Sequence, residues 1–204
     1  MIPSVNFLAH LHLSDGSPGS MLGGILADFI KGPDVAALPP DVLAGVMLHR
    51  HIDAFTDRHP VVQRSITRVS EKLGWFSGIV IDVYYDHILA REWDHYSAEP
   101  LRSFADRVYA VLDDRFALVP PDAGVFVRRF IETDRLLQYA TPEGIADTLF
   151  RLSGRIMERM PKRVVRLQDS MPDLLAADAD LAADFHAFYP ELIASADVWK
   201  ASSA

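Results

Sequence analysis

The chain has 204 residues, of which 50% are hydrophobic and 24% charged, enough for one globular domain over residues 1–204 with a buried core. It contains no cysteine, which excludes disulfides, thiol catalysis and thiolate-bound metals, so a metal site would need histidine and carboxylate ligands. A formal net charge of -8 argues against nucleic-acid binding, which needs a basic surface.

The N-terminal sequence MIPSVNFLAHLHLSDG lacks the basic stretch and long apolar run of a secretory leader. No window approaches the ~20 apolar residues that a membrane-spanning helix needs. We therefore expect a cytoplasmic protein that does not contact membranes.

Apolar residues recur at steps of three and four along most of the chain, which is typical of helices. The first expected helix follows Ser17-Pro18 and ends before Gly32-Pro33, and the second starts at the prolines before Asp41. The stretch after Gly74 is apolar on nearly every face; its β-branched residues also permit a strand, but its length favours a buried helix. Further amphipathic segments lie near 100–116, 122–139, 142–159, 162–176 and 179–200. The sequence predicts an all-α, single-domain helical bundle.

Six of the eight histidines precede residue 90, and acidic residues lie among them in apolar stretches. His49 and Asp53, like Asp82 and Asp86, are four residues apart, so each pair shares a helix face. A buried carboxylate is costly unless it meets a cation or hydrogen-bond donors, and Asp28 in GGILADFI raises the same difficulty. One shared metal ion would stabilise all of these groups.

Structural roles are the alternative for each of these residues. Asp28 could form a buried salt bridge, for example with Arg50, and Asp82 could lie near a positive helix end or pair with an arginine. We expect His12, His59 and His95 to be structural residues.

Imidazole and carboxylate ligands without thiolates suit Mn²⁺, Fe²⁺, Mg²⁺ or Zn²⁺. Such an ion supports hydrolysis, because it activates water and takes charge from a phosphoryl or carbonyl oxygen. Signals for other chemistries are missing from the sequence, which has no Walker loop, no dinucleotide-binding glycine motif and no G-x-S-x-G.

Five motifs, in order, resemble those of the bacterial acyl carrier protein phosphodiesterases: NFLAHLHLS, GGILADFIKG, LHRHIDAFTDRHP, IDVYYDHILAREW and FYPEL. That family is similar to the all-helical HD-type metal-dependent phosphohydrolases. The resemblance implies hydrolysis of 4′-phosphopantetheine from the serine of holo acyl carrier protein, typically with Mn²⁺. Two departures are visible. His51 stands where relatives often carry arginine, and the chain reads Asp86-His87, the reverse of the His-Asp order that names the HD group.

The resemblance places Asp28 at the family's essential aspartate and the other candidate ligands at its motif positions. We expect the metal to be held by His10, Asp28, His49, Asp53 and Asp86. His87 is the candidate acid for the leaving serine oxygen, and Arg50 could steady a phosphoryl oxygen, although a plain ion pair is an equal alternative for Arg50.

A basic segment interrupts the acidic chain between residues 151 and 166, where six basic residues accompany one acidic residue. Arg151, Arg155 and Arg159 are spaced by four and would line one helix face, with Arg163 just beyond. Acyl carrier proteins are small and acidic, so this face could dock the carrier. An ordinary solvated face is the alternative.

Two other functions stay open on the sequence. An HD-type phosphohydrolase could act on a small nucleotide, and a helical binding module could use the histidine and aspartate cluster structurally.

Overall fold

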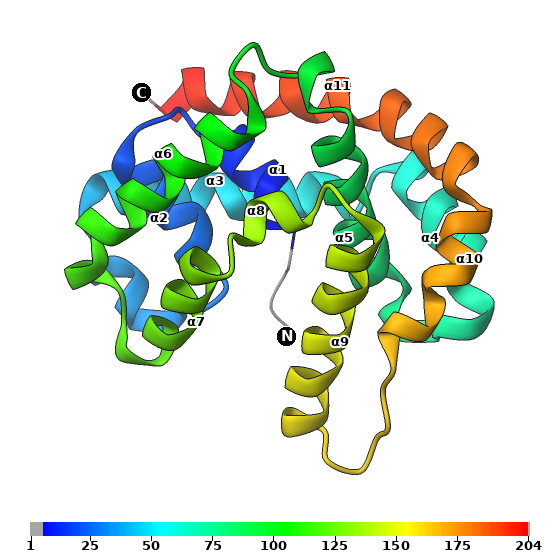
Figure 1. Ribbon diagram of the computed structural model, residues 1–204. Coiled ribbons are helices and arrows are strands. Elements are labelled where there is room, and N and C mark those ends of the chain that lie inside the picture. Colours follow the sequence, from blue (N-terminus) through cyan, green and yellow to red (C-terminus); the bar gives the residue numbers. More distant parts are fainter. Residues whose placement is uncertain (1–5, 204) are drawn as a thin grey trace.

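The computed structural model describes residues 6–203, which form helices joined by short turns, with no strand among them (Figure 1). The α-helices are α1 (Phe7–His12), α2 (Pro18–Leu26), α3 (Pro40–Thr56), α4 (Pro60–Leu73), α5 (Ser77–Arg91), α6 (Leu101–Asp114), α7 (Pro121–Glu132), α8 (Arg135–Gln138), α9 (Pro142–Arg159), α10 (Met171–Ala176) and α11 (Asp178–Ser203). Short 3₁₀ turns lie between them: η1 (Gly32–Ala37), η2 (Gly74–Phe76), η3 (Trp93–His95), η4 (Phe116–Leu118) and η5 (Leu167–Ser170). The predicted all-α class is confirmed. The N-terminal sequence MIPSVNFLAHLHLSDG, which gave no sign of a secretory leader, begins outside the described residues.

Helix α5 is largely buried in the core. Every residue from Val83 to Ala90 is buried, and the helix packs against α1, α4, α9 and α11. This matches the apolar character of its sequence on nearly every face, and the strand alternative for this segment is wrong.

Helices α2 and α3 cross at very short distance because glycines face one another. A Cβ added to Gly23 would lie 2.2 Å from the Val42 carbonyl oxygen, and one added to Gly45 would lie 2.4 Å from that of Ser20. No larger side chain fits there without moving a backbone. The close crossing brings the end of α2 beside His49 on α3.

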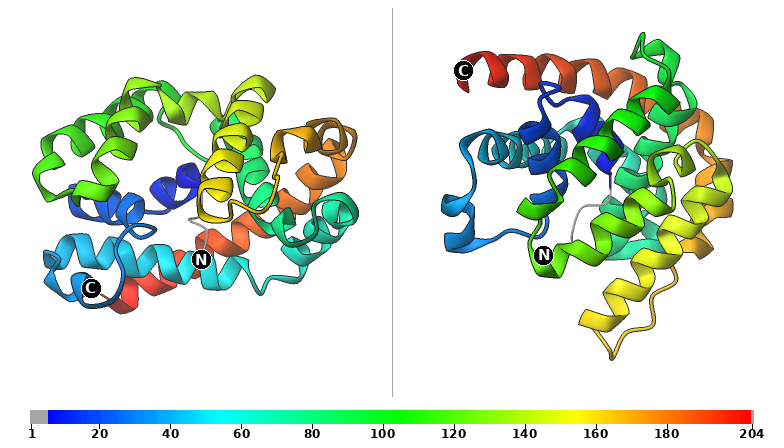
Figure 2. Two further views of the ribbon diagram at one scale, coloured as in Figure 1. Left: turned by 90° about the horizontal axis from the view of Figure 1, so that it is seen from below. Right: turned by 60° about the vertical axis from the view of Figure 1, so that its left-hand side comes forward.

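The long helix α11 lies against α3, α4 and α5, and the views of Figure 2 show it beside α3. Its buried Asp184 accepts hydrogen bonds from Arg64 Nε at 2.9 Å, Ser65 Oγ at 2.8 Å and Arg68 Nε at 3.1 Å, all on α4. The FYPEL segment therefore belongs to the same core as the N-terminal motifs.

Several expected boundaries were wrong. The first expected helix ends at Leu26, because residues 27–29 form a turn that carries Asp28. The segment 122–139 is split by Asp134, whose φ of 52° is left-handed and ends α7 before α8 begins. Most of 162–170 is irregular or 3₁₀, so Arg163 is not on a helix. Among the described residues, no helix is long and apolar enough to cross a membrane.

Candidate metal centre

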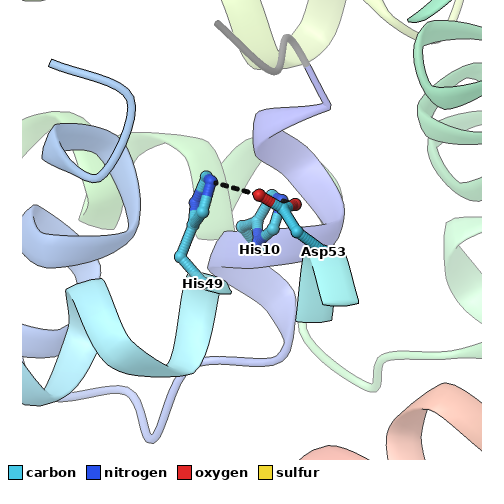
Figure 3. Close-up of side chains that lie close together, drawn as sticks. All are labelled: His10, His49 and Asp53. Atoms are coloured by element: carbon cyan, nitrogen blue, oxygen red, sulfur yellow. Dashed lines mark ion pairs between the residues drawn. The ribbon is translucent and has the colours of Figure 1, made fainter. Parts of the chain in front are cut away.

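Three of the predicted ligands converge in the structure. His10 comes from α1, and His49 and Asp53 come from successive turns of α3 (Figure 3). The Nε2 atoms of both histidines lie 3.2 Å from a carboxylate oxygen of Asp53, and one ligand atom from each residue lies within 4.8 Å of the others. The predicted spacing of four between His49 and Asp53 places both on the face toward α1.

Both imidazoles are buried, and their rings stack 3.7 Å apart at 10°. His49 Nδ1 donates a hydrogen bond to the Gly24 carbonyl at 2.8 Å, which turns Nε2 toward Asp53. Among the described residues, neither ring nitrogen of His10 has a hydrogen-bond partner, and His49 Nε2 has none either. Buried imidazole nitrogens that lack hydrogen bonds and face a carboxylate suit a divalent cation. The chemistry of His10, His49 and Asp53 therefore fits a metal site.

The electrostatics keep His10 and Asp53 in their ligating forms. Burial lowers the pKa of His49, but Asp53 and Asp28 outweigh it and the net shift is upward. Burial lowers the pKa of His10 to about 4, and the neighbouring His49 adds to that shift, so the imidazole is neutral at pH 7. Burial raises the pKa of Asp53, but the two histidines outweigh it and the net shift is downward. A neutral imidazole and an ionised carboxylate are the forms that bind metal.

Asp28 lies at the edge of this group, on the turn that follows α2. Its Oδ1 is 3.9 Å from His49 Nε2, and its side chain is 9% exposed. Arg50, the alternative partner for Asp28, is exposed, makes no salt bridge with a described residue and contacts Met47 Sδ at 3.9 Å. The structure therefore does not bring Arg50 to the site.

The two aspartates of α5 have different surroundings. Asp86 is fully buried, and its oxygens accept hydrogen bonds from the backbone N–H groups of Leu8 and Ala9, both at 2.9 Å. It holds the first turn of α1 and is not part of the group of three. Burial raises the pKa of Asp82 well above its ordinary value, and the carboxylates of Asp53 and Asp57 add to the shift. Asp82 is thus within electrostatic range of Asp53 and Asp28, although only Asp86 was predicted as a ligand.

His87 also lies outside the group of three. Its Nδ1 is 2.7 Å from the Tyr139 carbonyl oxygen and its ring packs on Tyr84. Its charged neighbours are Arg91, Asp178 and Glu92, at the other end of α5 from Asp82. Nothing in this arrangement brings His87 to the predicted place beside a leaving group.

The histidines expected to be structural have protein partners. His12 lies between the Tyr189 hydroxyl at 2.7 Å and the Tyr96 carbonyl at 3.2 Å, and His59 pairs with Glu191 at 3.3 Å. His95 approaches Glu92 at 3.8 Å on the surface.

The arginines of α9 do share one side, as their spacing predicts. Arg151, Arg155 and Arg159 all line a cavity of about 570 Å³ whose lining residues come mainly from α7 and α9. Arg163 lies beyond the end of α9 and is exposed.

The described part of the protein is all-helical and brings two buried histidines and an aspartate together. Residues 5–192 match the acyl carrier protein phosphodiesterase family. Acyl carrier protein phosphodiesterases of Escherichia coli are similar over 198 residues, 94% of this chain and 97% of theirs, with 33% identity for the O157:H7 protein and 32% for the K12 (DH10B) protein.

The chain therefore belongs to the acyl carrier protein phosphodiesterase family, as the five motifs indicated. No solved structure matches it. The relation to HD-type phosphohydrolases stays a prediction.

Proposed function

We propose that this protein is a metal-dependent phosphodiesterase that removes 4′-phosphopantetheine from the serine of holo acyl carrier protein and leaves the apo carrier. Membership of the acyl carrier protein phosphodiesterase family supports the reaction and the substrate. One observation carries the metal dependence: buried ring nitrogens of His10 and His49, without hydrogen bonds, face the carboxylate of Asp53.

The proposed ligands are His10, His49 and Asp53, with Asp28 beside them. We propose Mn²⁺, with Mg²⁺, Fe²⁺ and Zn²⁺ as alternatives that the same ligands accept. The ion would activate water for attack on phosphorus and take charge from the phosphoryl oxygens. Asp82 supports a cation as well, since its burial among other carboxylates is costly without a positive charge. It replaces Asp86 in the proposed set.

The protein groups around this centre hold it in a fixed geometry. The Gly24 carbonyl orients His49, and the ring of His10 stacks on it, so both Nε2 atoms point at Asp53. The Asp53 side chain is 38% exposed, which leaves one side of the centre open to a phosphodiester. Neither His87 nor Arg50 has a role in this proposal.

The proposed partner is the acidic carrier protein, and the proposed location is the cytoplasm. The exposed basic residues that follow α9, among them Arg163 and Arg166, would meet the carrier's acidic surface.

A matched pair of histidines on α3 tests the metal dependence. His49→Gln removes a proposed ligand, whereas His51→Gln alters a histidine two positions away that contacts Ser195 at 2.9 Å. We expect His49→Gln to weaken Mn²⁺ binding, measured calorimetrically, and to lower hydrolysis of holo carrier by at least about 100-fold, because a metal contributes several kcal/mol to such a step. His51→Gln should retain both.

Equal Mn²⁺ binding and activity in the two variants would contradict the proposal. Hydrolysis of free nucleotides with indifference to the carrier would instead support the nucleotide phosphohydrolase. A protein that binds no metal and hydrolyses neither substrate would support the binding module.

A further inference from the structure

A cavity of about 570 Å³ lies between α7 and α9, which stand on either side of α8 in Figure 1. Its volume is typical of sites for small ligands and is too small for a folded partner. Neither the family assignment nor the metal centre accounts for it.

The cavity adjoins the metal centre through two elements. Phe7 lines it from α1, three residues before His10, and Phe29 lines it directly after Asp28. Residues three apart in a helix lie on neighbouring parts of one face. A ligand that fills the cavity therefore ends near the candidate metal ligands.

The polar lining of the cavity is strongly basic. Two acidic residues, Asp122 and Glu158, accompany five arginines: Arg129, Arg135, Arg151, Arg155 and Arg159. A cavity with this excess of positive charge suits an anionic ligand.

Arg155 is the arginine best placed to contact such an anion. Arg135 and Arg151 pair with Asp147 at 3.4 and 2.7 Å, whereas Arg155 makes no salt bridge with a described residue. Its half-buried guanidinium lies 5.5 Å from the centre of the Phe126 ring. Burial lowers the pKa of Arg155, and the carboxylate of Asp28 is among the charged groups that oppose this shift.

The apolar lining is a continuous group of aromatic rings. Phe126 lies 5.3 Å from Phe7 and 5.0 Å from Phe29, and Phe130 lies 5.5 Å from Phe7, all measured between ring centres. Phe7 and Phe130 are fully buried, so the half-buried rings of Phe29 and Phe126 offer the apolar surface for the aliphatic part of a ligand whose anionic group meets Arg155.

We propose that this cavity is the subsite for the 4′-phosphopantetheine arm, with Arg155 on a phosphate oxygen and the phenylalanines against the pantetheine chain. The identity of the ligand rests on the proposed function. The phosphate would then lie at the end of the cavity nearest Asp28, and the carrier would stay outside.

Calorimetric titration of free 4′-phosphopantetheine and of pantetheine, which lacks the phosphate, tests the subsite. Arg155→Gln removes the proposed contact. Arg128→Gln is its matched control on α7, since Arg128 stacks on Phe116 at 4.1 Å and does not line the cavity. We expect Arg155→Gln to weaken binding of the phosphorylated compound by about 10- to 100-fold, the size of a lost charge-assisted hydrogen bond. Pantetheine should bind equally to all three proteins, and Arg155→Lys should recover part of the loss.

Wild-type protein that does not bind 4′-phosphopantetheine, or Arg155→Gln that binds it unchanged, would overturn the subsite. Hydrolysis of holo carrier by the wild-type protein is scored separately. Phosphate-dependent binding through Arg155 without carrier hydrolysis would support the subsite and contradict the proposed reaction. If the wild-type protein hydrolyses holo carrier and Arg155→Gln leaves KM and kcat unchanged, the proposed reaction is supported and the subsite is contradicted.

Discussion

Asp82 and Asp86 lie four residues apart on α5 but have different surroundings. Both lie on the same face of α5, so the spacing of four cannot separate them. The structure separates them, because α1 begins beside Asp86 and places two backbone N–H groups on its carboxylate. His10 was predicted as a ligand from the family motifs, whereas Asp28 was already indicated by its apolar surroundings in GGILADFI.

Replacement of Asp86 distinguishes a structural role from a ligand role. Asp86→Ala leaves the N–H groups of Leu8 and Ala9 buried without acceptors, so we expect the free energy of unfolding to fall by about 2–4 kcal/mol. Mn²⁺ affinity of the folded protein should change little. Chemical denaturation and calorimetry measure the two quantities, and a loss of Mn²⁺ affinity with unchanged stability would restore Asp86 as a ligand.

At the scale of helices, apolar periodicity predicted most of the long elements but missed α4, and it predicted the short ones poorly. The segment 142–159 matches α9 at both ends, and 179–200 differs from α11 by one residue at its start and three at its end. The six-residue α1 is too short for a periodic pattern, and it was not predicted although it carries His10. The break at Asp134 depends on a left-handed backbone that no residue pattern marked.

The α2–α3 crossing provides a stability test with an internal control. Gly45→Ala would place a methyl group 2.4 Å from the Ser20 carbonyl oxygen, so we expect it to destabilise the fold by about 1–3 kcal/mol. A methyl group added at Gly24 would meet no atom within 4 Å. Gly24→Ala should therefore be neutral or stabilising by up to about 1 kcal/mol, because alanine favours helices. Thermal unfolding of both variants measures this, and equal stabilities would contradict the close crossing.

The contact between α4 and α11 predicts a pH dependence of stability. Burial raises the pKa of Asp184, but Arg64, Ser65 and Arg68 outweigh it, and the net shift is downward. An acid with a lowered folded pKa stabilises the protein above its ordinary pKa near 4, and that stabilisation is lost as the pH falls.

We expect Asp184→Asn to lower the free energy of unfolding by about 1–3 kcal/mol at pH 7, with the lower end favoured because the arginines are partly exposed. The difference from wild type should shrink as the pH falls below about 4. Urea unfolding at pH 7 and pH 3 measures it, and a difference that is constant with pH would refute the ionic contact.

For the whole molecule, charge is distributed unevenly. The chain carries a net charge of -8, yet six basic residues accompany one acidic residue over 151–166. Their spacing predicted a common face, but not that Arg151, Arg155 and Arg159 line a cavity, because that depends on α7 opposite them. Arg163 and Arg166 are exposed and do not line the cavity.

Reversal of both exposed charges, Arg163→Glu with Arg166→Glu, should raise KM for the carrier and weaken its dependence on salt. Binding of free 4′-phosphopantetheine should stay unchanged, because neither residue lines the cavity. Steady-state kinetics at two salt concentrations measure the effect. An unchanged KM for the carrier would exclude docking by this segment.

The central claim is that this protein uses a metal ion to cut the carrier's phosphodiester bond. The most direct test is the intact mass of holo acyl carrier protein after incubation with the purified protein and Mn²⁺. Parallel reactions contain a chelator or the Asp28→Ala variant. We predict that the carrier loses the mass of 4′-phosphopantetheine only in the complete wild-type reaction. An unchanged carrier mass in that reaction, or the same loss with chelator present, would contradict the claim.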